Sequence, residues 1–168
     1  MVRRERGFSL PELLMVVAII AILAAIAIPN LLQALNKARQ KRSMADIRSI
    51  ATAWEARATD LGKYNAAGAG YLGISEPVTM DNLALSLQPT YIKAMPTHDG
   101  WTRDFYAYVD LPWGDATETS QRYVIASSGR DGVVNAGQAM GPFSSFDCDI
   151  IYANGTFMAY PQGMQVGN

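Results

Sequence analysis

The order of apolar and polar residues along the chain begins with one long apolar segment. Residues 13–28 read LLMVVAIIAILAAIAI, sixteen apolar residues without interruption. Together with Leu10, Leu31 and Leu32, this segment reaches the roughly 20 residues that a helix needs to cross a bilayer. We therefore predict a membrane-spanning helix over residues 8–32.

Beyond Pro29 the apolar residues recur at steps of three and four, which is the spacing of one helix face. The predicted apolar stripe consists of Met44, Ile47, Ile50, Ala51, Trp54, Ala58 and Leu61. Charged residues such as Asp46 and Arg48 lie off this stripe. The pattern indicates that residues 33–61 continue the same helix as an amphipathic half packed on a domain, with Gly62 as its stop.

The remainder, residues 62–168, has the pattern of a small α+β head. Residues 62–80 are rich in glycine and alanine and are typical of a loop, and a short helix is predicted at Met80–Leu87. Strands are predicted at Phe105–Val109, Arg122–Ser127, Ile150–Ala153 and Thr156–Tyr160. The pair Asn154-Gly155 between the last two favours a tight hairpin. We expect a long N-terminal helix packed on a small antiparallel sheet.

Composition excludes several classes of site. The chain has 168 residues and a formal net charge of −1, so no global field attracts nucleic acid. Cys148 is the only cysteine, which excludes an intramolecular disulfide, and His98 is the only histidine, which excludes a multi-histidine metal site. Ser127 or Ser128 with His98 has no spacing that supports a catalytic triad, so we do not expect an enzyme.

The apolar run alone also fits a secretory signal peptide or a plain single-pass anchor. A signal peptide is disfavoured because no small-residue cleavage site closes the run and the helical pattern continues beyond it. Glu12 is the only charge between Phe8 and Asn36. An ionised carboxylate at that depth is costly unless it is paired, so Glu12 is a candidate functional residue.

Around Glu12 the chain shows a recognisable motif. The sequence GFSLPELL at residues 7–14, after the basic leader MVRRER, resembles the class-III-type prepilin processing motif of type IV pilins and type II secretion pseudopilins. The resemblance implies that a prepilin peptidase removes residues 1–7 after Gly7 and methylates Phe8. It also implies that Glu12 pairs with the Phe8 amine of a neighbouring subunit, which neutralises two charges that are costly in lipid.

Two prolines bear on this resemblance. Pro11 stands where the family usually has an aliphatic residue, but in the first helical turn its missing N–H removes no helical bond. Pro29 lies inside the helix and removes one. The family commonly carries a proline there, and the resemblance implies that the helix can kink or locally melt at this residue during filament assembly.

The head resembles the major pseudopilin of type II secretion. The similar positions are Tyr91, Ile92, Pro96, Asp99 and Trp101, although Thr102 and Arg103 stand where that family has a glycine. The sequences SSGRDG at 127–132 and DCDI at 147–150 resemble the family's calcium-binding loop. The resemblance therefore implies a structural calcium ion held by Asp131, Asp147 and Asp149. This chain departs from the family by adding a hairpin after Ile150.

The function implied by the resemblance is that of a structural subunit of a type II secretion pseudopilus, a filament that polymerises through its N-terminal helix and drives protein export. The alternative is a major or minor pilin of a type IV pilus, which serves adhesion, twitching motility or DNA uptake. Either implies a bacterial inner-membrane protein that becomes a periplasmic or extracellular filament. Implied partners are further copies of the chain, the prepilin peptidase and an inner-membrane assembly platform, and no nucleic acid.

Charge counting leaves the membrane orientation open. The leader carries Arg3, Arg4 and Arg6. A basic cluster follows the apolar run, and its four residues are Lys37, Arg39, Lys41 and Arg42. By count the cluster would lie in the cytoplasm, whereas the resemblance places the leader inside and the head outside. The cluster also fits a nucleic-acid patch or a lipid-headgroup patch. We favour a solvated collar between membrane and head, because the cluster lacks interleaved aromatic residues.

Overall fold

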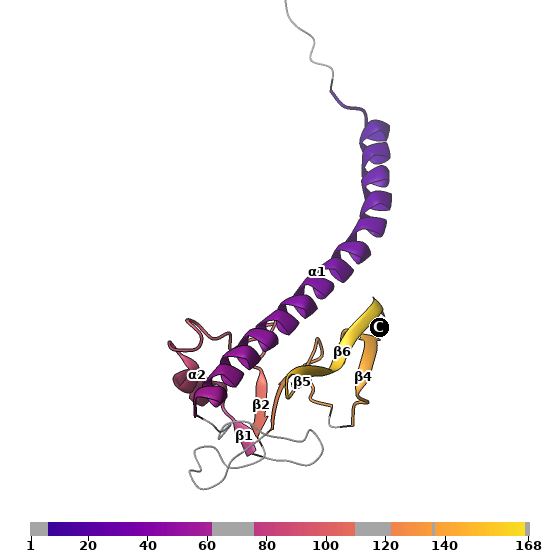
Figure 1. Cartoon of the computed structure of the whole chain (residues 1–168). Helices are drawn as coiled ribbons and strands as arrows, with labels where there is room; N and C mark the ends of the chain where they lie inside the picture. The colour runs from indigo at the N-terminus through magenta and orange to yellow at the C-terminus, as the bar shows by residue number, and fades with distance from the viewer. Residues whose placement is uncertain (1–6, 62–75, 110–121, 136, 167–168) are drawn as a thin grey trace, which may run out of the picture. The chain divides into compact units, whose positions relative to one another are not determined.

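The computed structural model describes residues 7–61, 76–109, 122–135 and 137–166 (Figure 1). The leader residues 1–6, residues 62–75 of the loop predicted at 62–80 and the predicted stop at Gly62 lie outside this range. The chain forms two compact units, Met1–Leu35 and Asn36–Asn168. A single helix, α1 (Leu10–Leu61), contributes to both units and confirms the prediction of one continuous N-terminal helix.

In the first unit, α1 has almost no cover. Every residue from 7 to 35 is exposed except Ala24, which is half-buried. By length and composition the helix is long and apolar enough to cross a membrane. Pro29 lies inside it and lacks the N–H that would reach the carbonyl of Ala25. An apolar surface of this kind needs lipid or other protein around it.

In the second unit, α1 packs on the head through the stripe that the sequence predicts. Ile47, Ile50 and Trp54 are buried almost completely, and Leu61 at the helix end is exposed. The indole ring of Trp54 lies 5.1 Å from the ring of Tyr123, measured between centroids. The Tyr123 hydroxyl donates a hydrogen bond to Glu55 on the same helix. Burial raises the pKa of Tyr123 far above its usual value, so this phenol stays protonated and remains a donor.

The head contains one helix and one sheet. The helix α2 (Met80–Leu87) has the predicted bounds, and the Thr79 hydroxyl caps its N-terminus by accepting from the amide of Asn82 at 3.3 Å. The sheet has six strands in the order β1-β2-β3-β5-β6-β4. The strands are β1 (Glu76–Val78), β2 (Tyr106–Val109), β3 (Tyr123–Ser127), β4 (Gly141–Ser145), β5 (Ile150–Ala153) and β6 (Thr156–Val166).

The sheet differs from the prediction in three respects. It is mixed rather than antiparallel, because β4 pairs with β6 in parallel. Strands β1 and β4 were not expected from the sequence, and β6 continues beyond the predicted end at Tyr160 to Val166. The reason is tertiary: β6 lies between β5 and β4, and the second partner extends its pairing past Pro161.

The predicted hairpin between β5 and β6 is confirmed. Asn154 and Gly155 have φ angles of 48° and 87°, as a two-residue turn of this kind requires, and Ala153 pairs with Thr156 across it. The side-chain oxygen of Asn154 also accepts the amide of Tyr123 at 3.0 Å. The turn therefore fastens the end of β3 as well as joining β5 to β6.

A loop between α2 and β2 is pinned to the start of the packed half of α1. Within it, buried Asp99 accepts the amides of Trp101 (2.8 Å) and Arg103 (3.0 Å) through one carboxylate oxygen. The amide of Gly100 donates to the Ser43 hydroxyl at 2.9 Å. A Cβ on Gly100 would lie 2.1 Å from the carbonyl oxygen of Arg39, so only glycine allows this approach.

Candidate functional site

The predicted processing junction lies at the exposed start of the chain's described part. Gly7 and Phe8 precede the first helical residue, Leu10, and the Phe8 side chain is 84% exposed. A side chain built on Gly7 would meet no atom within 4 Å. The fold of the chain therefore does not require glycine at this position. A requirement for glycine would come from a molecule that acts on this junction.

Glu12 lies in the first turn of α1 and closes a local capping arrangement. Its Oε2 atom accepts the backbone amide of Ser9 at 2.9 Å and the Ser9 hydroxyl at 2.6 Å. This is the reach-back half of a capping box, in which the third helical residue satisfies the amide that the helix leaves open. Oε1 has no hydrogen-bond partner in the part of the chain that the structure describes. One carboxylate oxygen thus orders the helix start and the other can take a cation.

The C-terminal loops hold the three predicted calcium ligands, on the segments joining β3 to β4 and β4 to β5. The loops lie back to back at Gly129, where a Cβ would approach the Cys148 carbonyl oxygen to 2.7 Å. Asp147 is held by Arg130 through two hydrogen bonds of 2.7 Å. These bonds hold the pKa of Asp147 below its usual value. Both carboxylate oxygens of Asp147 are therefore engaged by the Arg130 guanidinium.

Asp149 has different surroundings. It is 1% exposed, and its Oδ2 atom accepts the amide of Asn135 at 2.7 Å. Gln138 holds its backbone from both sides, accepting the Asp149 amide at 2.7 Å and donating to its carbonyl at 2.8 Å. Oδ1 is buried and has no hydrogen-bond partner among the residues that the structure describes. Burial, together with the charge of Asp131, raises the pKa of Asp149. A cation beside Oδ1 would relieve both effects.

The three aspartates are not gathered in one cluster. Asp131 is exposed, and its Oδ1 accepts the amide of Val133 at 3.0 Å. Across residues 7–61, 76–109, 122–135 and 137–166, no three acidic, histidine or cysteine side chains are close enough to hold a metal ion. Asp149 has one oxygen without a partner among the described residues, and Asp131 lies near enough for its charge to raise the pKa of Asp149. Asp147 does not fit while it pairs with Arg130.

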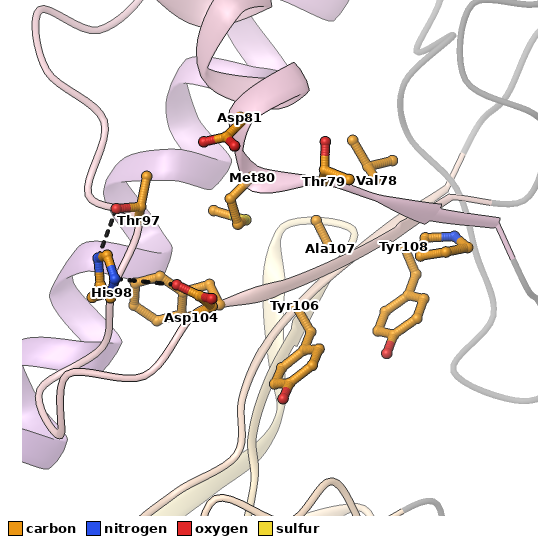
Figure 2. Close-up of a pocket in the computed structure, with 12 residues that line it drawn as sticks. Val78, Thr79, Met80, Asp81, Thr97, His98, Asp104, Tyr106, Ala107 and Tyr108 are labelled. Carbon is orange, nitrogen blue, oxygen red and sulfur yellow. Dashed lines mark hydrogen bonds and ion pairs between the residues drawn. The ribbon is translucent and has the colours of Figure 1, made fainter.

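His98 and Ser127 are not catalytic partners in this fold. Figure 2 shows His98 at a pocket between α2 and β2, where its ring contacts the Thr97 hydroxyl at 2.8 Å and Asp104 at 3.2 Å. The Ser127 hydroxyl instead donates to Asp99 at 2.7 Å. The hydroxyl and the imidazole thus serve different structural contacts, and Asp99 joins the end of β3 to the loop that touches α1.

Sequence reasoning missed the contact that ties the C-terminal strand to α1. Gln40 and Gln165 are both buried, and their amide groups lie 3.4 Å apart. Gln165 also donates to the carbonyl oxygens of Phe143 (3.1 Å) and Gln162 (3.2 Å). The sequence signal for this contact was Gln40, which lies three residues before Ser43 on the helix face. Its partner Gln165 could not be inferred from residue spacing.

Comparison with known proteins finds one matching family model and several similar secretion proteins. Residues 2–28 match the family model described as the prokaryotic N-terminal methylation motif. Type II secretion system core protein G of Vibrio cholerae is 30% identical over 86% of this chain and 96% of its own. Its counterpart in Escherichia coli K12 is 31% identical over 61% of this chain and 70% of its own.

A pilin is also similar over a shorter stretch. The type IV major pilin protein PilA of Myxococcus xanthus is 40% identical over 37% of this chain and 28% of its own. No solved structure matches significantly. The similarity to the secretion proteins therefore extends over most of the chain, whereas the similarity to the pilin covers little more than a third of it.

Proposed function

This chain belongs to the family of type II secretion system core protein G, and we propose on that basis that it is the structural subunit of a type II secretion pseudopilus. The observation that carries the proposal is the order of three features along the chain. A methylation motif and an exposed apolar helix precede a head whose sequence is similar to that of core protein G. In this role α1 first anchors the subunit in the inner membrane and then packs against other copies, driving export as the filament grows.

The chemistry of assembly rests on Glu12 and the new N-terminus. Cleavage after Gly7 creates an amine on Phe8, four residues before Glu12. In lipid the amine and the carboxylate are each costly alone, and a pair between neighbouring subunits removes both costs. Because Oε2 is taken by Ser9, the free Oε1 is the atom we assign to the neighbour's amine. Pro29 removes one helical bond further along, which eases local rearrangement of α1.

Processing after Gly7 gives a direct test. Gly7→Phe should leave an unprocessed precursor, because a bulky residue obstructs the peptidase although the chain itself has open space there. Mass spectrometry of the wild-type protein should show removal of residues 1–7 and a methyl group on Phe8. Gly137→Ala is the matched control, since a Cβ on Gly137 also meets nothing within 4 Å. Normal maturation of Gly7→Phe would contradict the assignment.

The alternative is a type IV pilin, favoured by the similarity to the Myxococcus pilin. The two functions differ in what is lost when the gene is deleted. Loss of secreted enzymes with intact surface motility supports the pseudopilus, and loss of twitching with intact secretion supports the pilus. Neighbouring genes for a secretin and a secretion ATPase, or for a retraction ATPase, would discriminate in the same sense.

For the C-terminal loops we propose a structural calcium ion, which would be held by Asp149 and Asp131 with nearby backbone carbonyls and with Asp147 as a further ligand. Calcium in proteins takes six to eight oxygen ligands of these kinds. The buried, unpartnered Oδ1 of Asp149 supports the proposal, and the raised pKa of Asp149 means that its ionised form costs stability at neutral pH. A bound cation would offset that cost and stabilise the head.

Calcium binding can be tested with the full chain in detergent. Calcium should raise the melting temperature relative to chelator, and Asp149→Asn should abolish the difference. If Asp147 is a ligand, Arg130→Gln should strengthen calcium binding by removing its competitor. Asp81→Asn, an exposed carboxylate on α2, is the control. Identical melting temperatures with calcium and with chelator would contradict the calcium site. The three aspartates would then have a role in loop structure alone.

A further inference from the structure

A cationic collar follows the apolar segment on the same helix. It consists of four exposed residues, Lys37, Arg39, Lys41 and Arg42. Arg42 pairs with Asp46 at 3.4 Å. Across the described ranges, Lys37, Arg39 and Lys41 have no carboxylate within ion-pair distance. The collar therefore keeps an uncompensated positive charge that an anionic partner could meet.

The part of the head beside the collar adds an apolar tip. The loop containing Gly100 touches the backbone of Arg39. The end of β6 reaches α1 through Gln165 and Gln40, and the adjacent Met164 is 81% exposed. Cations and an exposed methionine thus share the end of the head from which α1 leaves.

The position of the collar along α1 limits what its partner can be. Lys37 lies five positions after Leu32, the last residue of the predicted span. At ~1.5 Å of rise per residue this is about 8 Å, at the outer edge of the polar headgroup layer of a bilayer. Lysine and arginine side chains extend toward that layer from helix ends. While the subunit is anchored, the start of the collar therefore lies close to the phosphate groups.

We propose that the collar, with Met164 beside it, docks the head on anionic phospholipid headgroups of the membrane before the subunit enters the filament. The inference rests on the proposed anchoring through α1. Juxtamembrane cations are each attracted to an anionic surface, and several together hold a segment there. Exposed Met164 would enter the interface. Docking would keep the head close to the membrane until assembly withdraws it.

The test uses the mature full chain in vesicles of phosphatidylcholine, with or without phosphatidylglycerol. A polarity-sensitive fluorophore is placed by Met164→Cys in a chain that also carries Cys148→Ser. We expect a blue shift of its emission only when phosphatidylglycerol is present. Because the contact is electrostatic, ~1 M salt should remove the shift, since the Debye length falls to about 3 Å.

Charge variants then identify the surface. Lys37→Gln with Lys41→Gln should abolish most of the shift. Lys93→Gln with Arg122→Gln removes the same charge from exposed positions elsewhere in the head and should retain it. An unshifted wild-type emission, or a shift that survives the collar variant, would overturn the proposal. A shift that grows with the protein-to-lipid ratio would instead assign the collar to a second copy and also overturn it.

Alkaline extraction of the same vesicles tests the membrane anchoring of α1 separately from the docking surface. A chain that resists extraction but shows no lipid-dependent shift refutes the docking surface and leaves the pseudopilin role intact. A chain that is extracted as a peripheral protein refutes the anchoring, and with it both the membrane role of α1 and the docking surface.

Discussion

Glu12→Ala is expected to be processed and inserted normally but to reduce filament yield by roughly tenfold or more, because an amine left without its partner in lipid is strongly disfavoured. Methylation of Phe8 should also fall. The variant removes the only charge between Phe8 and Asn36, so no other side chain in the apolar run can replace it. Filaments sheared from cells and quantified against total processed subunit provide the measurement.

Ser9→Ala separates the two roles that Glu12 has in the structure. It removes the hydroxyl that bonds to Oε2 but keeps the carboxylate and the backbone amide bond. If Glu12 acts by pairing with a neighbour, Ser9→Ala should assemble nearly as well as the wild type. If capping of α1 were the whole role, Ser9→Ala should share part of the assembly defect of Glu12→Ala. Wild-type yield from Glu12→Ala itself would show that the charge pair is dispensable.

The second large effect is on stability. Gly100→Ala should destabilise the head by about 3 kcal/mol or more, at or beyond the upper end of the usual cost of overpacking, because a Cβ there meets backbone on the facing helix. The added methyl carbon would lie 2.1 Å from the Arg39 carbonyl oxygen and 2.6 Å from its carbon, so no side-chain rotation relieves the clash. Separation would also lengthen the bond from the Gly100 amide to Ser43.

Thermal unfolding of the full chain in detergent measures this cost. Gly137→Ala is the matched control, since it adds the same methyl group in open space. The two variants change composition identically, so a difference between their melting temperatures reports the approach of the loop to α1. Equal melting temperatures would mean that the loop moves away from the helix at little cost and that Gly100 is not a structural requirement.

The parts of the fold that the sequence predicted are those dictated by local pattern. The three- and four-residue spacing from Met44 onward correctly predicted which face of α1 is buried. Helix α2 and strand β5 have the predicted bounds, and Asn154-Gly155 forms the turn that its φ preferences favour. In each case the determining residues are neighbours in the chain.

The parts that were not predicted depend on pairing between distant segments. Strand β4 contains Gly141, Pro142 and two serines, which are poor strand formers, and it is extended because β6 offers it a parallel partner. Strand β1 has only three residues and includes Pro77 at a sheet edge. No local signal distinguishes such segments from loops.

The candidate sites divide in the same way. Gly7, Phe8 and Glu12 lie within six residues of one another, and these residue types ahead of the apolar run carried the resemblance to the prepilin motif. The calcium ligands were implied by the resemblance of two segments to the family's calcium-binding loop, but the pairing of Asp147 with Arg130 depends on how two loops stack at Gly129. Because of that contact, Asp147 pairs with Arg130 whereas Asp149 does not, although the two aspartates are only two residues apart. This difference can be seen only in the folded structure.

The bond between Gln40 and Gln165 joins positions 125 residues apart, and this separation bears on the order of synthesis. Gln40 is synthesised 125 residues before Gln165, so the buried amide on α1 lacks this partner until β6 has been made. A chain lacking β6 would expose that amide and leave β4 without its pairing partner. The packed half of α1 and strand β4 therefore both depend on β6.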